Sequence, residues 1–357
     1  MAVAADTAPH AVRYGSAKAV AIWLFVIAAM IGVMVLVGGL TRLTGSGLSI
    51  TEWRPVTGAL PPLSDVAWQA EFAKYQDTPQ YDLLNRGMGL AAFKTIYWWE
   101  WTHRLLGRLI GVAFAVPFLA FLWQQRIDRA LAIRLGIIFL LGAAQGALGW
   151  WMVQSGLVEE RVAVSQYRLA AHLGLAIILF GYVLWTAFEV VGAQKTAVAN
   201  FARFRTFVLI FAALVFGQML LGAFVAGLDA GQAFSTWPTY GGAWIPSGLY
   251  DLSPWWINHF ENHTLVHFQH RTMGYAVAIA AIWLFLSIRH SGPDKPVRLA
   301  GVHVLALVVL QVALGVFTVL SGVALPLAAL HQIVALLLFA CALWRAYTLG
   351  DRHAAMA

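Results

Sequence analysis

Four histidines stand out because each lies near the start of a long apolar run, where an ionisable side chain is costly unless it has a function. They are His103, His172, His270 and His331. Two imidazoles on facing helices of a four-helix bundle can hold a heme iron between two nitrogens. The sequence therefore predicts two heme sites, one formed by the first pair and one by the second. A hydrogen-bonded structural histidine is the alternative for any one of them.

Three arginines lie beside these histidines. Arg104 and Arg271 each directly follow a histidine of one pair, and Arg168 precedes His172 by about one helical turn. A guanidinium group binds carboxylates in a bidentate manner, so these arginines are candidates for binding heme propionates. Anchoring of the helix at the membrane interface is the alternative for each arginine.

A carboxylate distinguishes the two predicted sites. Glu100 precedes His103 by three residues and so shares its helix face, whereas the corresponding position of the second half is His267. A carboxylate can move protons or stabilise a cationic intermediate. We therefore expect chemistry at the first site and electron transfer at the second. The alternative for Glu100 is an ion pair with Arg104 or Lys94.

Other metal chemistry is less favoured. Each histidine pair lacks the further ligands that structural zinc needs, and Cys341 is the only cysteine, which excludes an intrachain disulfide or a thiolate cluster. His263, His267 and His270 share one helical face, so a metal site there remains an alternative. We assign no role to His259.

The elements that must position these residues are membrane helices. Of the 357 residues 61% are hydrophobic and 11% are charged, against about 25% charged in soluble domains, and this excludes a water-soluble globule. The apolar runs have the length of about 20 residues that crosses a bilayer. We predict an all-α polytopic membrane protein with eight transmembrane helices. They span residues 19–40, 104–123, 133–153, 168–188, 206–227, 269–288, 298–320 and 326–348.

An internal duplication divides these helices into two pseudo-symmetric four-helix bundles. We expect an N-terminal half at residues 1–188 with a long outer loop at 41–95, a cytoplasmic linker at 189–205 and a C-terminal half at 206–357. The aligned pairs and their sequence shifts are Gly38 with Gly222 (184), His103 with His270 (167), Gln145 with Gln311 (166) and His172 with His331 (159).

The formal net charge of +7 reflects topology rather than nucleic-acid binding, because the basic residues are scattered between spans and form no stripe. Most connections after even-numbered spans carry Lys or Arg, including Lys195 and Arg352 near the ends of the two halves. Between Arg205 and Arg271 there is no Lys or Arg. By the positive-inside rule both termini are cytoplasmic, and the loop at 41–95 and its degenerate copy are outer lids over the two sites.

Five motifs in the sequence resemble those of heme A synthase. They are GGLTRLTGSGLSITEWRPVTGALPP from Gly38, FKTIYWWEWTHRLLGR from Phe93, AAHLGLA from Ala170, FQHRTMGY from Phe268 and the LHQ that contains His331. The similarity covers essentially the whole chain. It is closest to the form found in alphaproteobacteria and mitochondria, because the outer-loop cysteine pair of the Bacillus-type branch is missing.

The resemblance implies oxidation of a methyl group of heme O to the formyl group of heme A, through two hydroxylations and loss of water, for assembly of cytochrome c oxidase. It implies that His270 and His331 ligate a resident heme b and that His103 and His172 flank the substrate heme. Glu100 matches the family's catalytic glutamate, whereas Ala92 replaces a frequent acidic residue. Heme O synthase and oxidase assembly factors are the implied partners, and the inner membrane is the implied location.

Two other classes of protein compete with this interpretation. A diheme cytochrome b that only relays electrons would have the same histidine pairs but gives no reason for the difference between Glu100 and His267. A transporter would show broken helices and several charges deep in the spans, and neither is evident.

Overall fold

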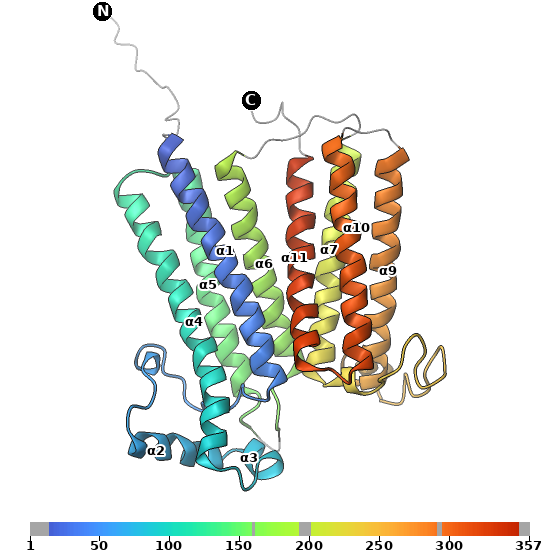
Figure 1. Cartoon of the computed structure of the whole chain (residues 1–357). Helices are drawn as coiled ribbons and strands as arrows, with labels where there is room; N and C mark the ends of the chain where they lie inside the picture. Colours follow the sequence, from blue (N-terminus) through green and yellow to red (C-terminus); the bar gives the residue numbers. More distant parts are fainter. Residues whose placement is uncertain (1–13, 159–160, 193–200, 291–294, 350–357) are drawn as a thin grey trace, which may run out of the picture.

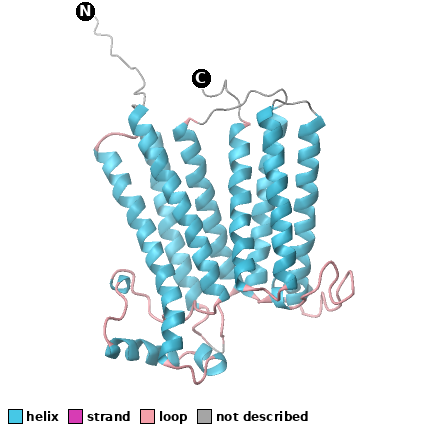
Figure 2. Ribbon diagram, in the orientation of Figure 1, coloured by secondary structure: helices cyan, strands magenta, loops and turns pink. Residues whose placement is uncertain are grey.

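The computed structural model describes residues 14–158, 161–192, 201–290 and 295–349 (Figure 1). These residues form helices and loops without a β-strand (Figure 2). Among them, eight helices are long and apolar enough to cross a membrane, which confirms the predicted fold class. These helices are α1 (Tyr14–Leu43), α4 (Leu90–Trp123), α5 (Arg129–Gln154), α6 (Gln166–Val191), α7 (Phe201–Gly227), α9 (His263–His290), α10 (Lys295–Leu320) and α11 (Leu325–Thr348).

The ends of several spans follow from local sequence. The carboxylate of Asp128 accepts a hydrogen bond from the backbone N–H of Leu131 at 2.7 Å and so caps the start of α5. Gly192 follows α6 with φ of 62°, a left-handed conformation that terminates helices and favours glycine. A proline in the first turn of α11 suits that position, because its missing N–H has no partner there.

The helices pack as two groups of four that lie side by side (Figure 1). In the first group α1, α4, α5 and α6 contact one another in a closed ring, and in the second α7, α9, α10 and α11 do so in the same order. Between the groups, α6 packs against α7 and α11, and α1 packs against α11. Gly181 of α6 permits this approach, since an added Cβ would lie 3.2 Å from the ring of Phe339. The symmetry axis and the domain bounds stay predictions.

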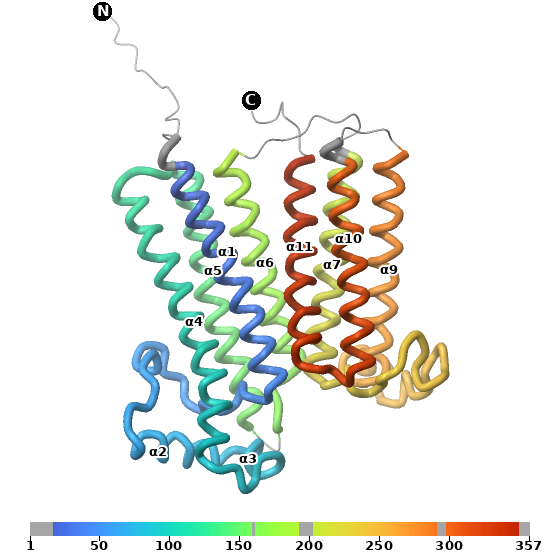
Figure 3. Tube along the Cα trace, viewed as in Figure 1, coloured from blue at the N-terminus to red at the C-terminus, as the bar shows by residue number. Residues whose placement is uncertain are grey.

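The two long loops emerge at the same end of the bundle, opposite to the start of α1 and the end of α11 (Figure 3). The first loop contains helices that the sequence interpretation missed, namely η1 (Thr57–Ala59), α2 (Asp65–Gln76) and α3 (Pro79–Leu84). They share a small apolar core with the start of α4, formed by Trp68, Phe72, Tyr75, Phe93 and Tyr97. The second loop contains η2 (Ala230–Gln232), η3 (Trp255–Ile257) and α8 (Asn258–Glu261).

Two helices begin well before their predicted starts. Helix α4 begins at Leu90 instead of 104 and α9 at His263 instead of 269, so the histidines of both helices lie inside them rather than at their ends. Parts of the predicted linker are helical, because residues 189–191 belong to α6 and 201–205 to α7. Residues 193–200 of the linker, with Lys195, lie outside the described residues, as does Arg352.

Candidate heme sites

Each of the four histidines packs against a glycine of a neighbouring helix in its own half. A Cβ atom added to any of these glycines would lie only 2.9–3.3 Å from the imidazole Cε1 atom, so a larger residue would push the ring away. The same contact therefore recurs four times in the bundle. The pairs are Gly38 with His103, Gly149 with His172, Gly222 with His270 and Gly315 with His331.

The structure brings the rings of His270 and His331 close together across the second bundle. Their ring centroids are 6.4 Å apart, with an angle of 80° between the ring planes. A first-row metal ion lies about 2 Å from each imidazole nitrogen that binds it. The rest of the distance between the ring centres is the distance from each nitrogen to the centre of its own ring. The pair thus fits bis-histidine coordination of a heme iron. In the first bundle, His103 and His172 are close enough to interact electrostatically.

Glutamines support three of the histidines, and the sequence interpretation did not single them out. The side-chain amides of Gln145, Gln218 and Gln311 donate to the backbone carbonyls of His172, His270 and His331 at 3.0, 2.9 and 2.9 Å. Each glutamine precedes a histidine-contacting glycine by one helical turn. The recurring Gln-x-x-x-Gly spacing was the signal in the sequence that would have found them.

Glu100 is buried, with 3% of its surface exposed, and its carboxylate has partners on both sides. One oxygen accepts hydrogen bonds from the Ser49 hydroxyl and the Ile50 backbone N–H, both at 2.8 Å, and the other lies 2.6 Å from Nη2 of Arg104. Of the two ion-pair partners considered from sequence, Arg104 is therefore the one found. Lys94 instead lies 5.0 Å from the ring centre of Trp68.

The other hydrogen bonds of Arg104 attach the first loop to α4. Its guanidinium donates to the backbone carbonyls of Ile50 at 2.7 Å and Glu52 at 2.8 Å. Arg108 makes similar bonds one turn further along, to the carbonyls of Arg54 and Pro55, both at 2.8 Å. Arg104 is therefore held by the loop and by Glu100, and a role in binding propionate stays a prediction.

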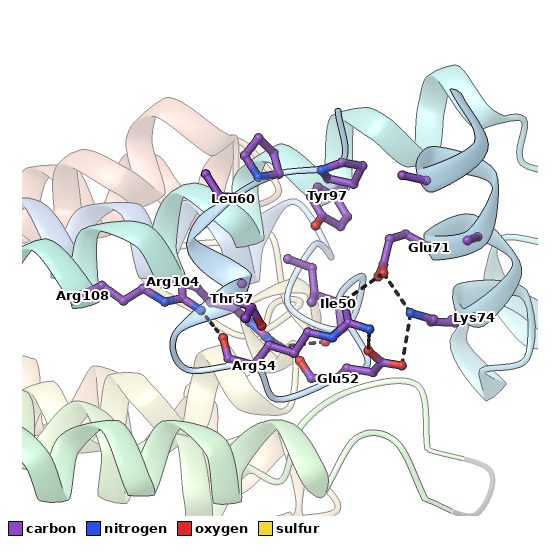
Figure 4. Close-up of a pocket in the computed structure, with 15 residues that line it drawn as sticks. Ile50, Glu52, Arg54, Thr57, Leu60, Glu71, Lys74, Tyr97, Arg104 and Arg108 are labelled. Carbon is purple, nitrogen blue, oxygen red and sulfur yellow. Dashed lines mark hydrogen bonds and ion pairs between the residues drawn. The ribbon is translucent and has the colours of Figure 1, made fainter. Parts of the chain in front are cut away.

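A cavity of about 350 Å³ lies beside this attachment, between the first loop, α2 and α4 (Figure 4). Its charged lining contains four cations and two carboxylates, so the cavity has a net positive charge. Glu52 pairs with Arg54 and accepts a hydrogen bond from Lys74 at 3.1 Å. The Lys74 hydrogen bond holds the pKa of the Glu52 carboxyl below its ordinary value. The charged lining residues are Glu52, Arg54, Glu71, Lys74, Arg104 and Arg108.

Among the residues that the structure describes, Arg271, the counterpart of Arg104, has no carboxylate partner. It is buried, donates to the carbonyl of Pro238 at 3.1 Å and lies 4.0 Å from the ring centre of Tyr240. Its Nε and Nη1 atoms are buried without a hydrogen-bond partner. Two unused N–H donors of a buried cation fit a carboxylate such as a heme propionate. Burial raises the pKa of Tyr240 to about 12, although the nearby Arg271 opposes this effect.

His267 occupies the position that corresponds to Glu100. Its ring is buried beside Phe234 and Tyr240, and its Nδ1 atom has no partner. Among the described residues no group of three metal-ligating side chains is found, so nothing in this part of the chain supports the alternative metal site at His263, His267 and His270. His259 contacts the Gln269 side chain at 3.0 Å.

The remaining predicted arginine, Arg168, contacts one residue, Trp151, through both its backbone and its ring. It donates to the carbonyl of Trp151 at 2.7 Å and stacks over the ring of that residue at 4.2 Å.

The two histidine sites are connected through contacts between α1 and α11. Gly38 contacts His103, and the next residue, Gly39, lies against Gln332, which follows His331 and donates to the carbonyl of Val35 at 2.8 Å.

Comparison of the chain with known protein families identifies its family over nearly its full length. The model of the COX15-CtaA family, described as cytochrome oxidase assembly protein, matches residues 21–343. This range includes both histidine pairs. The chain belongs to the cytochrome oxidase assembly protein family.

Named relatives of this cytochrome oxidase assembly protein support the assignment. A protein of Parvibaculum lavamentivorans named heme A synthase is 49% identical over 93% of this chain and 94% of its own length. The heme A synthase of Paracoccus denitrificans is 48% identical over 91% of the chain and 86% of its own length, and that of Nitrosospira multiformis is 48% identical over 93% and 94%. The resemblance expected from the five motifs is confirmed.

Proposed function

We propose that this chain is a heme A synthase, an enzyme that oxidises a methyl group of heme O to the formyl group of heme A for assembly of cytochrome c oxidase. The observation that carries the proposal is the contrast between two similarly built sites. Both place histidines against glycines of neighbouring helices, but only one of them has a buried carboxylate beside the histidine.

In the C-terminal half, His270 and His331 would hold a resident heme b. The distance between their rings suits an iron ion, and the unpartnered N–H groups of Arg271 suit a propionate. The resident heme supplies one-electron transfer when it is bound. The protein contributes a buried bis-histidine site without a neighbouring acid, because His267 replaces the glutamate, and this composition favours electron transfer over proton chemistry.

In the N-terminal half, His103 and His172 flank the substrate heme, and Arg104 and Arg168 lie beside them as candidates for its carboxylates. Glu100 is the proton-handling residue. Its carboxylate is one turn from His103, and the Ser49 hydroxyl that donates to it at 2.8 Å can both donate and accept a proton. The overall oxidation, two successive hydroxylations of the methyl group and loss of water, gains one oxygen atom from water and releases four protons and four electrons. An electron acceptor outside this chain takes up the electrons.

The chain is a multi-pass membrane protein, and we place it in the inner membrane with both termini in the cytoplasm. Arginines at the end where α1 begins and α11 ends support this orientation by the positive-inside rule, whereas the loop between α7 and α9 has no Lys or Arg. Heme O synthase and oxidase assembly factors are the partners expected for an enzyme that receives heme O and delivers heme A.

The experiment is chromatography of hemes extracted from membranes of a host that makes heme O, with and without this chain. Accumulation of heme A or a hydroxylated heme supports the proposal. Accumulation of heme b alone, with a normal bis-histidine spectrum, would identify the chain as an electron relay and contradict it.

A further inference from the structure

The His103 position differs from the other three histidine positions in one residue of the neighbouring helix. At those three positions, a glutamine one turn before the contacting glycine donates to the histidine backbone. In α1 the residue one turn before Gly38 is Met34. The shift of 184 that aligns Gly38 with Gly222 also aligns Met34 with Gln218, so this is a second difference between the two halves beside that at Glu100.

Met34 occupies the place that the glutamine has in the other half. A Cβ atom added to Gly107 would lie 3.4 Å from Cε of Met34, and one added to Gly274 would lie 3.5 Å from Nε2 of Gln218. Both glycines follow the histidine of their own helix by one turn. A thioether has no N–H to donate. Among the described residues, no side chain donates a hydrogen bond to the ring or the backbone carbonyl of His103.

The amides also touch the imidazole rings. The Nε2 atoms of Gln145 and Gln218 lie 3.2 Å from Nδ1 of His172 and His270, and that of Gln311 lies 3.4 Å from Nε2 of His331. The Oε1 atoms of the three glutamines are buried without a partner. Because each Nε2 atom donates to the backbone carbonyl of its histidine, the amide is held against the imidazole ring. Packing of the amide on the ring, together with its bond to the backbone, restricts the rotation of the imidazole.

We propose that Gln145, Gln218 and Gln311 are positioning residues that hold His172, His270 and His331 in a fixed orientation, and that Met34 leaves His103 as the ligand that releases heme iron most readily. This inference rests on the proposed function. A substrate heme must enter and a product heme must leave, so both bonds to its iron have to break, and a loosely held histidine lets the first of them break readily. The resident heme stays, and both of its histidines have a glutamine.

Reciprocal substitutions in the full-length chain test this proposal in a host that makes heme O. Met34→Gln gives His103 the missing amide, and we expect more heme per protein after purification together with a fall of about tenfold or more in heme A yield. Gln218→Met removes the amide at His270, and we expect heme b to dissociate about tenfold faster or more into an excess of a heme-scavenging protein, with an altered low-spin electron paramagnetic resonance signal. Met34→Leu adds no donor and should behave as the wild type.

The outcomes are separable. Wild-type heme content and heme A yield in Met34→Gln, or an unchanged dissociation rate and spectrum in Gln218→Met, would overturn the proposal. A loss of heme A in Met34→Leu equal to that in Met34→Gln would also overturn it, because the effect would then be one of packing. If the wild type makes no heme A, the proposed function fails, whereas the dissociation rate and spectrum of Gln218→Met still decide the role of the glutamine.

Discussion

Glu100 and Arg104 form a buried ion pair along one turn of α4, with Oε1 of the carboxylate 2.6 Å from Nη2 of the guanidinium. Both partners also bind the first loop, the acid through Ser49 and Ile50 and the arginine through the carbonyls of Ile50 and Glu52. The pair therefore fixes the loop over the helix that carries His103. The described residues of the other half contain no counterpart of this pair, because Arg271 has no acid beside it there.

Glu100→Gln keeps the shape of the side chain but removes its charge and its ability to exchange protons. We expect heme A formation to fall by about 100-fold or more, the usual contribution of a general acid or base, while the heme b content stays unchanged. The measurement is heme chromatography at equal protein level. The double variant Glu100→Gln/Arg104→Gln is the control, because it removes both buried charges. If it regains heme A synthesis, Glu100 is only a structural partner of Arg104.

Arg271→Gln removes a buried cation whose Nε and Nη1 atoms have no partner in the described part of the chain. We expect the rate of heme b loss to rise by roughly 10-fold to 100-fold, which corresponds to the roughly 1.5–3 kcal/mol of a hydrogen bond to a charged group. Arg271→Lys keeps the charge without the planar fork and should be intermediate. An unchanged rate in Arg271→Gln would show that no propionate binds there.

The first loop should loosen in acid. The Lys74 hydrogen bond holds the pKa of Glu52 below its ordinary value of 4.5, so this carboxylate stabilises the folded loop above pH 4.5. That contribution disappears as the pH falls through the lowered pKa. Hydrogen exchange in the peptide at residues 65–76 should therefore increase in this range. Lys74→Met should weaken the pH dependence, and the same dependence in that variant would contradict the assignment.

Topology can be tested with single cysteines, because Cys341 is the only native one. In a Cys341→Ala background we expect Trp244→Cys to react with a membrane-impermeant maleimide in intact cells. Arg126→Cys should react only after permeabilisation. The reverse pattern would place the long loops in the cytoplasm.

The helices and the histidines were predictable from sequence because hydropathy and an internal repeat are properties of the chain itself. The helices of the first loop were not, because their apolar residues, such as Phe72 and Tyr75, are few and pack on α4. Only one of the partners of Glu100 could be predicted from the sequence. An ion pair with Arg104 follows from helical spacing, whereas the contacts with Ser49 and Ile50 depend on how the loop folds back. The Gln145 contact required knowing which helix faces His172.

The central claim is that one histidine pair binds the substrate heme and the other the resident heme b. Heme chromatography of the four single variants to alanine tests it most directly. We expect His103→Ala and His172→Ala to lose heme A formation while retaining heme b at the wild-type ratio to protein. His270→Ala and His331→Ala should lose the bound heme b and its low-spin spectrum. Equal loss of heme b in all four variants, or normal heme A synthesis without His103 or His172, would contradict the account.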